Sequence, residues 1–164
     1  MKGIEMPIDI TDRLAISDLL AVYGDVLDAG QYNEWPGLFA EECVYTVYDA
    51  ADAERGLSIG YMLDDCRARV LDRVKFVTEV WRGTVEPYRT RHVTQLVRIN
   101  PAGAGRYTVR SNFMVSYTQP DGTCGLLVAG RAQDVVQVSA GRAQFVERKL
   151  YLDGTPARYL VYPL

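Results

Sequence analysis

A chain of 164 residues with 48% hydrophobic residues and a net charge of −3 has the size and composition of one globular domain. Its apolar runs are too short to span a membrane, and the scatter of Arg among Asp and Glu predicts no basic face for nucleic acid. We expect one domain over residues 1–164, with an N-terminal arm at 1–10 and a C-terminal tail at 155–164. The start of the chain lacks the apolar stretch of a signal peptide, which predicts a cytoplasmic protein.

The first predicted element is an amphipathic helix over residues 11–28. Its apolar residues recur at the spacing of one helical face: Ile16, Leu19, Leu20, Tyr23, Val26 and Leu27. Thr11 can cap its start, and Gly30 can end it in a left-handed conformation. A second, short helix is predicted over 34–40 after an Asn33 cap.

A strand is predicted over residues 44–48, followed by a polar surface loop that reaches Gly60. The longest helix is predicted over 61–80, because apolar residues again follow a helical period there: Leu63, Cys66, Val70, Val74, Val77 and Trp81. Trp35 and Trp81 are expected on the core faces of their helices.

Beyond Pro87 the hydrophobic period changes to two, which is typical of strands. The predicted strands cover 89–100, 106–119, 123–139 and 142–153, and short connections rich in Gly and Pro join them as antiparallel neighbours. Helices followed by a long antiparallel meander predict an α+β domain. In such a domain the helices cover one face of a curved sheet, and we expect a cavity between the sheet and the helices.

His92 is the only histidine, which restricts the chemistry of this chain. A Rieske cluster needs two histidines and two cysteines, and a mononuclear iron triad needs two histidines and a carboxylate. We therefore expect no metal and no cofactor in this chain. The cysteines Cys43, Cys66 and Cys124 match no metal or disulfide spacing, and we expect reduced, mostly buried thiols.

Three interpretations of the candidate site residues remain open. His92 can be a structural or interface side chain, or it can act with Asp28 and Tyr23 as an acid–base site in the cavity of a stand-alone isomerase or dehydratase. A third possibility is a binding module that holds a small apolar ligand in the cavity without chemistry.

Two further groups are candidates for contacts with a partner subunit. Arginine forms bidentate ion pairs and is enriched at interfaces, and the candidates are Arg89, Arg91, Arg98, Arg110 and Arg131. The tail at 155–164 is rich in apolar residues, including Tyr159 and Tyr162, so we expect it to pack against a neighbouring subunit or to seal the cavity.

Several runs of this sequence resemble the β subunits of ring-hydroxylating dioxygenases, especially those of the terephthalate and salicylate hydroxylase type. The runs are Tyr23, Leu27-Asp28, Trp35-Pro36-Gly37-Leu38-Phe39, Cys43-Val44-Tyr45-Thr46-Val47, Gly56-Leu57, Leu71-Asp72-Arg73-Val74 and Arg91-His92. The resemblance covers about residues 20 to 100. Tyr88 is a departure, because many members have a histidine at that place.

The resemblance implies a cone-shaped fold of the nuclear transport factor 2-like and SnoaL-like superfamily. It also implies a non-catalytic role in assembly, beside a large α subunit that carries a Rieske [2Fe–2S] cluster and mononuclear Fe(II). In this family the subunits usually form an α3β3 hexamer with β–β contacts, which receives electrons from a reductase or ferredoxin and serves the catabolism of aromatic compounds such as aromatic acids. Residues expected at subunit interfaces are Arg89, Arg91, His92, Arg98, Tyr159 and Tyr162.

Overall fold

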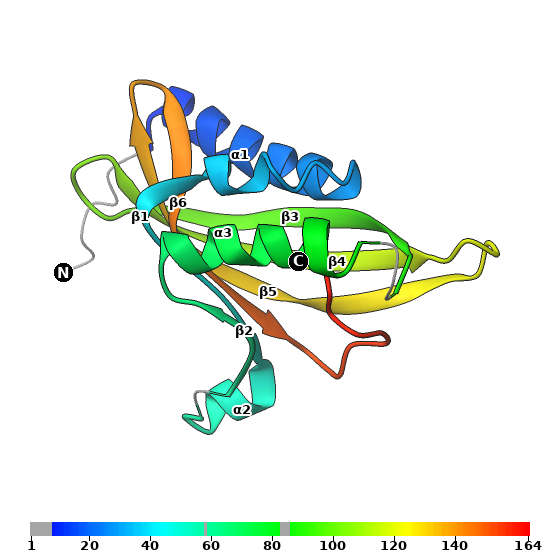
Figure 1. The fold of residues 1–164 in the computed structure, drawn as a ribbon. Helices are drawn as coiled ribbons and strands as arrows, with labels where there is room; N and C mark the ends of the chain where they lie inside the picture. The colour runs from blue at the N-terminus through cyan, green and yellow to red at the C-terminus, as the bar shows by residue number, and fades with distance from the viewer. Residues whose placement is uncertain (1–7, 58, 83–85) are drawn as a thin grey trace.

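The structure is a computed structural model that describes residues 8–57, 59–82 and 86–164. Most of the expected arm at 1–10 lies outside the described residues. The helical segments are α1 (Ile10–Asp28), η1 (Trp35–Leu38), α2 (Ala50–Glu54), α3 (Arg67–Lys75) and η2 (Phe76–Val80). The strands are β1 (Phe39–Asp49), β2 (Gly60–Asp64), β3 (Arg89–Pro101), β4 (Arg106–Thr118), β5 (Cys124–Ser139) and β6 (Arg142–Leu152) (Figure 1).

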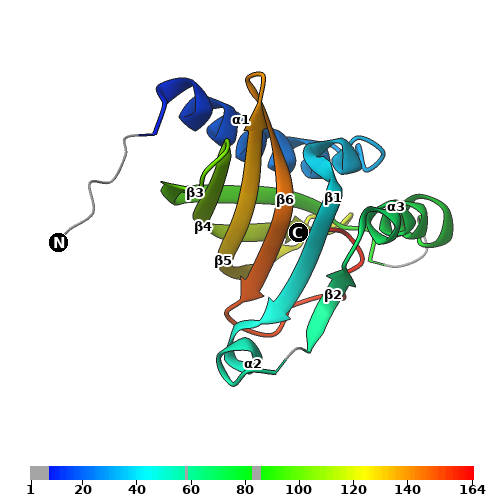
Figure 2. The ribbon, with the colours of Figure 1, turned by 90° about the vertical axis from the view of Figure 1, so that its left-hand side faces the viewer.

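The six strands form one sheet in the order β2-β1-β6-β5-β4-β3. Neighbours are antiparallel except β1 and β6, which run parallel. Figure 2 shows the sheet curling from β1 round to β3, with α1 lying across it. The predicted α+β fold is confirmed, and the four strands predicted after Pro87 begin and end within a residue of their predicted bounds.

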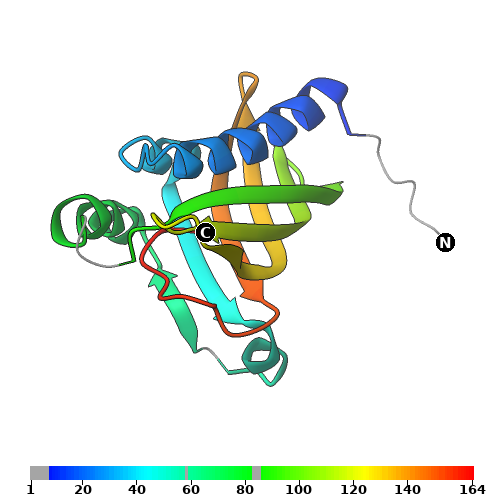
Figure 3. The same cartoon turned by 90° about the vertical axis from the view of Figure 1, so that its right-hand side faces the viewer.

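The first helix has the buried face that its sequence predicts. Its six periodic apolar residues are all buried, and the helix packs against β3, β5 and β6 (Figure 3). The predicted cap at Thr11 is wrong, because the side chain of Asp9 accepts a hydrogen bond from the Thr11 main-chain N–H at 2.7 Å. Gly30 follows the helix with a φ of +70°, as predicted, because glycine adopts this left-handed conformation without a steric cost.

The predicted helix over 61–80 is wrong at its start. Residues 60–64 form strand β2 instead, in which Met62 and Asp64 are buried while Tyr61 and Leu63 are exposed. This strand pairs with the edge of β1 and so satisfies main-chain groups that would otherwise lack partners. Leu63 fits both the period of two in β2 and the helical period of the residues that follow. The hydrophobic pattern therefore predicted one helix where the structure has a strand and then a helix.

Three shorter elements also differ from the prediction. Only Trp35–Leu38 is helical in the segment predicted over 34–40, as a 3₁₀ turn, and β1 begins at Phe39 rather than at Val44. The connection predicted as a loop contains α2, whose first N–H groups are capped by the side chain of Asp49. The 3₁₀ turn and α2 have four and five residues, too few to show a hydrophobic period, and the first five residues of β1 do not alternate in burial.

Burial corrects two further predictions. Trp35 is fully buried, as predicted, but 38% of Trp81 is exposed. Cys43 is buried, whereas Cys66 and Cys124 are exposed, so the thiols are not mostly buried. Within the described part of the chain, none of the helices combines the length and the apolar character needed to cross a bilayer.

The core lies between the curved sheet and α1, and aromatic rings dominate one part of it. The rings of Tyr23 and Phe145 lie 5.5 Å apart between centroids, and those of Trp35 and Tyr45 lie 5.0 Å apart, both edge to face. Phe39 contacts the same group. Edge-to-face contacts are the favourable geometry for aromatic pairs, so this cluster fills the interior with a defined packing.

Candidate functional site

The interior of the cone also contains a buried ion pair. Arg148 on β6 donates from Nη1 to Oδ2 of Asp134 on β5 at 2.7 Å, and the two side chains are 3% and 0% exposed. The Arg148 guanidinium lies 4.1 Å from the centroid of the Tyr23 ring and 4.7 Å from that of Phe145. The pair is therefore packed into the aromatic cluster, where cation–π contacts help to replace lost hydration.

The ion pair is incompletely satisfied. Oδ1 of Asp134 and Nε of Arg148 have no hydrogen-bond partner among the described residues. Burial raises the pKa of Asp134 to about 6, and the positive charge of Arg148 opposes the rise only in part. A buried carboxyl with a raised pKa is a common mark of an active site, but this one has no accessible surface through which a substrate could reach it.

Leu164, the last residue of the sequence, is buried in the interior near this ion pair. Its side chain is 2% exposed, and its main-chain N–H donates to the hydroxyl of Tyr45 at 2.9 Å. The hydroxyl of Tyr23 donates to the main-chain carbonyl oxygen of Leu164. Of the two outcomes expected for the tail, contact with a neighbour or closure of the cavity, the geometry therefore favours closure at Leu164.

Asp28 and His92 are brought together, as the acid–base hypothesis requires. Nδ1 of His92 lies 2.6 Å from Oδ1 of Asp28, and the His92 main-chain N–H donates to Oδ2 at 2.9 Å. The hydroxyl of Thr90 donates to Oδ1 at 3.0 Å. Burial would raise the pKa of Asp28, but the hydrogen bonds from His92 and Thr90 outweigh it and lower that pKa below the ordinary value.

Tyr23 makes no hydrogen bond with this pair, because its hydroxyl donates to the main-chain oxygen of Leu164 in the core. The His92 ring is held against α1, where its Cβ would lie 3.1 Å from a Cβ added to Gly24. A groove of about 440 Å³ runs between α1 and β3 past His92, with Leu20 and Leu96 among its lining residues. Nevertheless, Nε2 of His92 has less than 1 Å² of accessible surface and no partner in the part of the chain that the structure covers.

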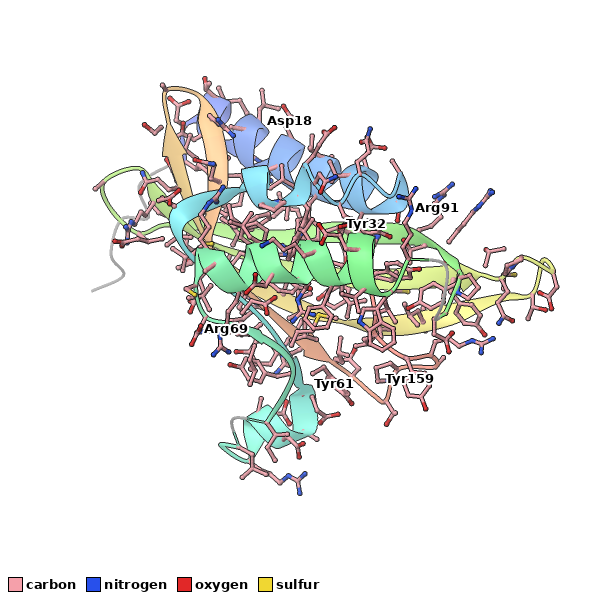
Figure 4. All side chains as sticks on the ribbon, in the orientation of Figure 1. Asp18, Tyr32, Tyr61, Arg69, Arg91 and Tyr159 are labelled. Carbon is pink, nitrogen blue, oxygen red and sulfur yellow. The ribbon has the colours of Figure 1, made fainter. Side chains whose placement is uncertain are left out.

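The candidate interface residues differ in how much of each side chain is exposed. The arginines Arg89, Arg91 and Arg98 are exposed on β3, and 77% of Tyr159 is exposed. Tyr162, in contrast, stacks on the ring of Tyr32 at 5.5 Å between centroids and donates to the main-chain oxygen of Glu86 at 3.3 Å. Figure 4 shows Arg91 and Tyr159 extending from the ribbon to the surface.

Asp134 and Arg148 were not singled out from the sequence as site residues. One signal was present: Asp134 is the only acidic residue in β5 and occupies an inward position between Ala132 and Val136, both buried. An acid at an inward position of a strand needs a buried cation, but the alternation does not say which of the arginines supplies it.

Comparison with known proteins identifies the family. The family model for the ring hydroxylating beta subunit matches residues 24–156. The chain is 24% identical to the terminal oxygenase component subunit beta 2 of terephthalate 1,2-dioxygenase from Comamonas sp, over 88% of this chain and 92% of that one. It is 27% identical to the anthranilate 1,2-dioxygenase small subunit from Burkholderia cepacia, over 76% and 77% of the two chains.

A crystal structure shows the same relationship. The β subunit assigned to an aromatic-ring-hydroxylating dioxygenase of Novosphingobium aromaticivorans superposes with a TM-score of 0.80 and 26% identity, over 92% of this chain and 95% of that one. The fold is thus the cone of nuclear transport factor 2-like proteins. This chain belongs to the family of ring-hydroxylating dioxygenase β subunits.

Proposed function

We propose that this chain is the non-catalytic small subunit of a cytoplasmic dioxygenase that acts in the catabolism of an aromatic compound, with an aromatic acid as the substrate class. A large subunit would carry the Rieske [2Fe–2S] cluster and the mononuclear Fe(II), and a reductase or ferredoxin would supply electrons from NAD(P)H. Support for an acid substrate comes from the terephthalate and anthranilate dioxygenases whose small subunits match this chain. We propose an α3β3 hexamer with β–β contacts for the assembly.

The residues of this chain do not fit the metal groups of such an enzyme. The sequence contains one histidine, whereas the Rieske cluster and the mononuclear iron each require two. Among the described residues, no group of three or more His, Cys, Asp or Glu side chains is arranged to hold a metal ion. The metals would therefore have to be bound entirely by the large subunit.

The observation that carries the proposal is the filled interior of the cone. A stand-alone enzyme of this shape needs a pocket in which reactive side chains meet a ligand, and the groove past His92 does not provide one because Nε2 of His92 is covered. Here the aromatic cluster, the Arg148–Asp134 pair and Leu164 occupy the space between α1 and the sheet. The raised pKa of Asp134 is thus a consequence of burial in a packed core, and it supports a structural role.

The surface supports an assembly role. Sixteen large hydrophobic side chains are exposed in the described part of the chain, and all of them except Tyr159 fall into four groups. The groups are Ile10, Leu14 and Val22 on α1; Leu57, Ile59, Tyr61 and Leu63 around β2; Leu71, Phe76, Val80 and Trp81 on α3 and η2; and Val93, Val97, Met114 and Leu126 on β3 to β5. Grouped apolar exposure marks surfaces that a partner covers.

The test is co-expression of this chain with the large subunit of the same oxygenase. We expect one complex that contains both chains and iron, with dioxygen uptake that depends on an aromatic acid, as measured by light scattering, metal analysis and oxygen consumption. The chain purified alone should contain no stoichiometric iron and should turn over none of the same substrates. A failure of the two chains to co-purify would contradict the proposal.

A second candidate, a stand-alone isomerase or dehydratase, is favoured by one observation, the 2.6 Å contact between Asp28 and His92. Two observations argue against this function: Nε2 of His92 is covered, and the hydroxyl of Tyr23 is hydrogen-bonded to Leu164 instead of facing the pair. The deciding measurement is turnover of cyclic ketones and hydroxylated aromatics by the isolated chain and by His92→Gln. Turnover that disappears in His92→Gln, while the variant keeps its melting temperature, would establish this second function.

A further inference from the structure

The three strands β3, β4 and β5 have an unusual distribution of charge. They contain six arginines and one acidic residue, Asp134, which is buried. The arginines are Arg89, Arg91, Arg98, Arg106, Arg110 and Arg131. Because the whole chain has a net charge of −3, this concentration of positive charge is local to the three strands.

These arginines lie on the outer face of the sheet, away from α1. His92 faces α1, so the Cβ atoms of its neighbours Arg91 and Val93 on β3 point to the opposite face. The guanidinium of Arg91 nevertheless also donates to the main-chain oxygen of Asp28 at 3.5 Å. On β4 the same alternation buries Val109 and Ser111 and exposes Arg110 between them. We call this outer surface of β3, β4 and β5 the arginine face. The prediction that the chain has no basic face is therefore wrong, because the pairing of β3, β4 and β5 gathers arginines that are scattered along the sequence.

Most charges of the arginine face have no counter-charge among the described residues of the monomer, although Arg91 and Arg106 donate hydrogen bonds to neutral oxygens. Arg131 pairs with Glu54 at 3.3 Å, but the other five arginines form no ion pair within residues 8–57, 59–82 and 86–164. Arg98 and Arg110 are direct neighbours across the β3–β4 ladder, and like charges in such positions destabilise a sheet. An anionic partner would remove this repulsion.

The centre of the arginine face is apolar. Val93 and Met114 are direct neighbours across the ladder, with exposed fractions of 59% and 50%, and Ala129 follows on β5. Val97 and Leu126 are exposed on the same strands. An apolar centre with a charged rim is the usual composition of a protein–protein interface.

The outer side of α1 has the complementary composition. With its cap residue, α1 contains five aspartates and one arginine, Arg13. Leu14, Asp18, Val22 and Asp25 are exposed and are spaced by three or four residues, so they form one stripe along the helix, which we call the α1 ridge. Among the ion pairs of described residues, none includes Asp18 or Asp25, and Figure 4 shows Asp18 at the surface of the molecule.

We propose that the α1 ridge of one copy of this chain docks on the arginine face of a second copy. Leu14 and Val22 would cover the apolar centre around Val93 and Met114, while Asp18 and Asp25 would lie among the arginines. The argument for a second copy is this complementarity of charge and apolar surface, since both halves of the interface are present on one chain.

The two surfaces are different parts of the chain, so the contact is head to tail. Figures 2 and 3 show α1 lying across one side of the curved sheet, and the arginine face is the other side. A head-to-tail contact produces a ring when the rotation between copies closes. The inference rests on the proposed function, and it specifies which surfaces make the β–β contacts within the assembly.

The test uses charge reversal on each surface and on both. The α1 reversal is Asp18→Arg with Asp25→Arg, and the sheet reversal is Arg98→Glu with Arg110→Glu. Each reversal alone should weaken self-association of the small subunit at least about tenfold, and the chain that combines both should recover it, as measured by sedimentation velocity. The control reverses two exposed cations of α3, Arg69→Glu with Lys75→Glu, and should associate as the unaltered chain does.

Melting temperatures separate loss of contact from loss of folding. The inference is overturned if the unaltered chain stays monomeric at its highest attainable concentration, if either reversal associates normally, or if the combined variant folds without recovering association. A sheet reversal that blocks binding of the large subunit but not self-association would also overturn it. In that last case the co-purification test still supports the proposed function, so the two can fail separately.

Discussion

The two faces of the strand β4 have opposite compositions, one mostly apolar and buried, the other mostly polar and exposed. The inward residues Val109, Ser111, Phe113 and Val115 are buried in the core, whereas the outward residues Arg110, Asn112 and Met114 are exposed. The inward face thus stabilises the fold of the single chain. The outward face leaves apolar surface and positive charge uncovered, which is what a subunit needs for binding its neighbours.

The largest expected effect is on the inward side, at the buried ion pair. Asp134→Ala leaves the Arg148 guanidinium buried without a counter-charge, and we expect the free energy of unfolding to fall by about 3–5 kcal/mol. Urea unfolding followed by circular dichroism measures this change. The control is the double variant Asp134→Leu with Arg148→Met, which should lie between neutral and about 4 kcal/mol more stable, because no buried charge remains.

The second prediction concerns the pH dependence of stability. Burial raises the pKa of Asp134 to about 6 from an ordinary value of 3.8, so the folded chain binds this proton more tightly than the unfolded chain does. The stabilisation from this proton is complete below the ordinary pKa and is lost as the pH rises through about 6. Across that range Asp134 should lower the free energy of unfolding by roughly 2–3 kcal/mol.

The variant Asp134→Asn isolates this effect, because its side chain does not titrate. Asp28 acts in the opposite direction: its pKa is lowered, so its contribution is present above the ordinary carboxyl pKa and is lost as the pH falls through the lowered value. Both proteins keep Asp28, so the difference between their pH profiles reports Asp134. Parallel profiles for the two proteins would show that the folded-state pKa of Asp134 is not raised.

A third prediction tests the close approach of β5 and β6. A Cβ added at Gly130 would overlap the main-chain carbonyl oxygen of Tyr151, so Gly130→Ala must separate the two strands. We expect a loss of about 2–3 kcal/mol in the free energy of unfolding. Gly37→Ala is the matched control, because a Cβ there meets no atom within 4 Å, and it should change stability by less than about 1 kcal/mol. Equal losses would refute the close approach.

The sequence predicted those elements whose hydrophobic period extends over ten or more residues. Helix α1 and strands β3 to β6 are of this kind, and their bounds agree with the structure to within one residue. Strand β2 covers only five residues, and Leu63 also fits the period of the helix that follows. The sequence therefore predicted β2 as part of that helix. The pairing of β1 with β6 depends on contacts a hundred residues apart, which no local pattern encodes.

The candidate site also contains some contacts that local sequence patterns suggest and others that only the folded chain shows. Asp28 and His92 meet, as the acid–base hypothesis requires, because a helix end and an edge strand that pack together bring their polar residues into contact. Tyr23 lies on the same helix but faces Leu164, which is 141 residues away, and only the folded chain shows that contact. The Asp134–Arg148 pair was missed because the inward side of a strand is evident from alternation, whereas the partner of a buried charge is not.

The smallest expected effect compares adjacent residues on opposite faces of β4. Val115 is fully buried, so Val115→Thr places a hydroxyl in the apolar interior and should cost about 1–3 kcal/mol of stability. Met114 is half exposed on the arginine face, so Met114→Gln should change the stability of the isolated chain by less than about 0.5 kcal/mol. Thermal unfolding of both variants at low protein concentration measures this contrast. Met114→Gln should still weaken self-association in sedimentation velocity, because it removes apolar surface from the centre of the proposed contact. If Met114→Gln destabilised the chain as much as Val115→Thr does, the inward face would not be the one that stabilises the fold, and the contrast between the two faces of β4 would be contradicted.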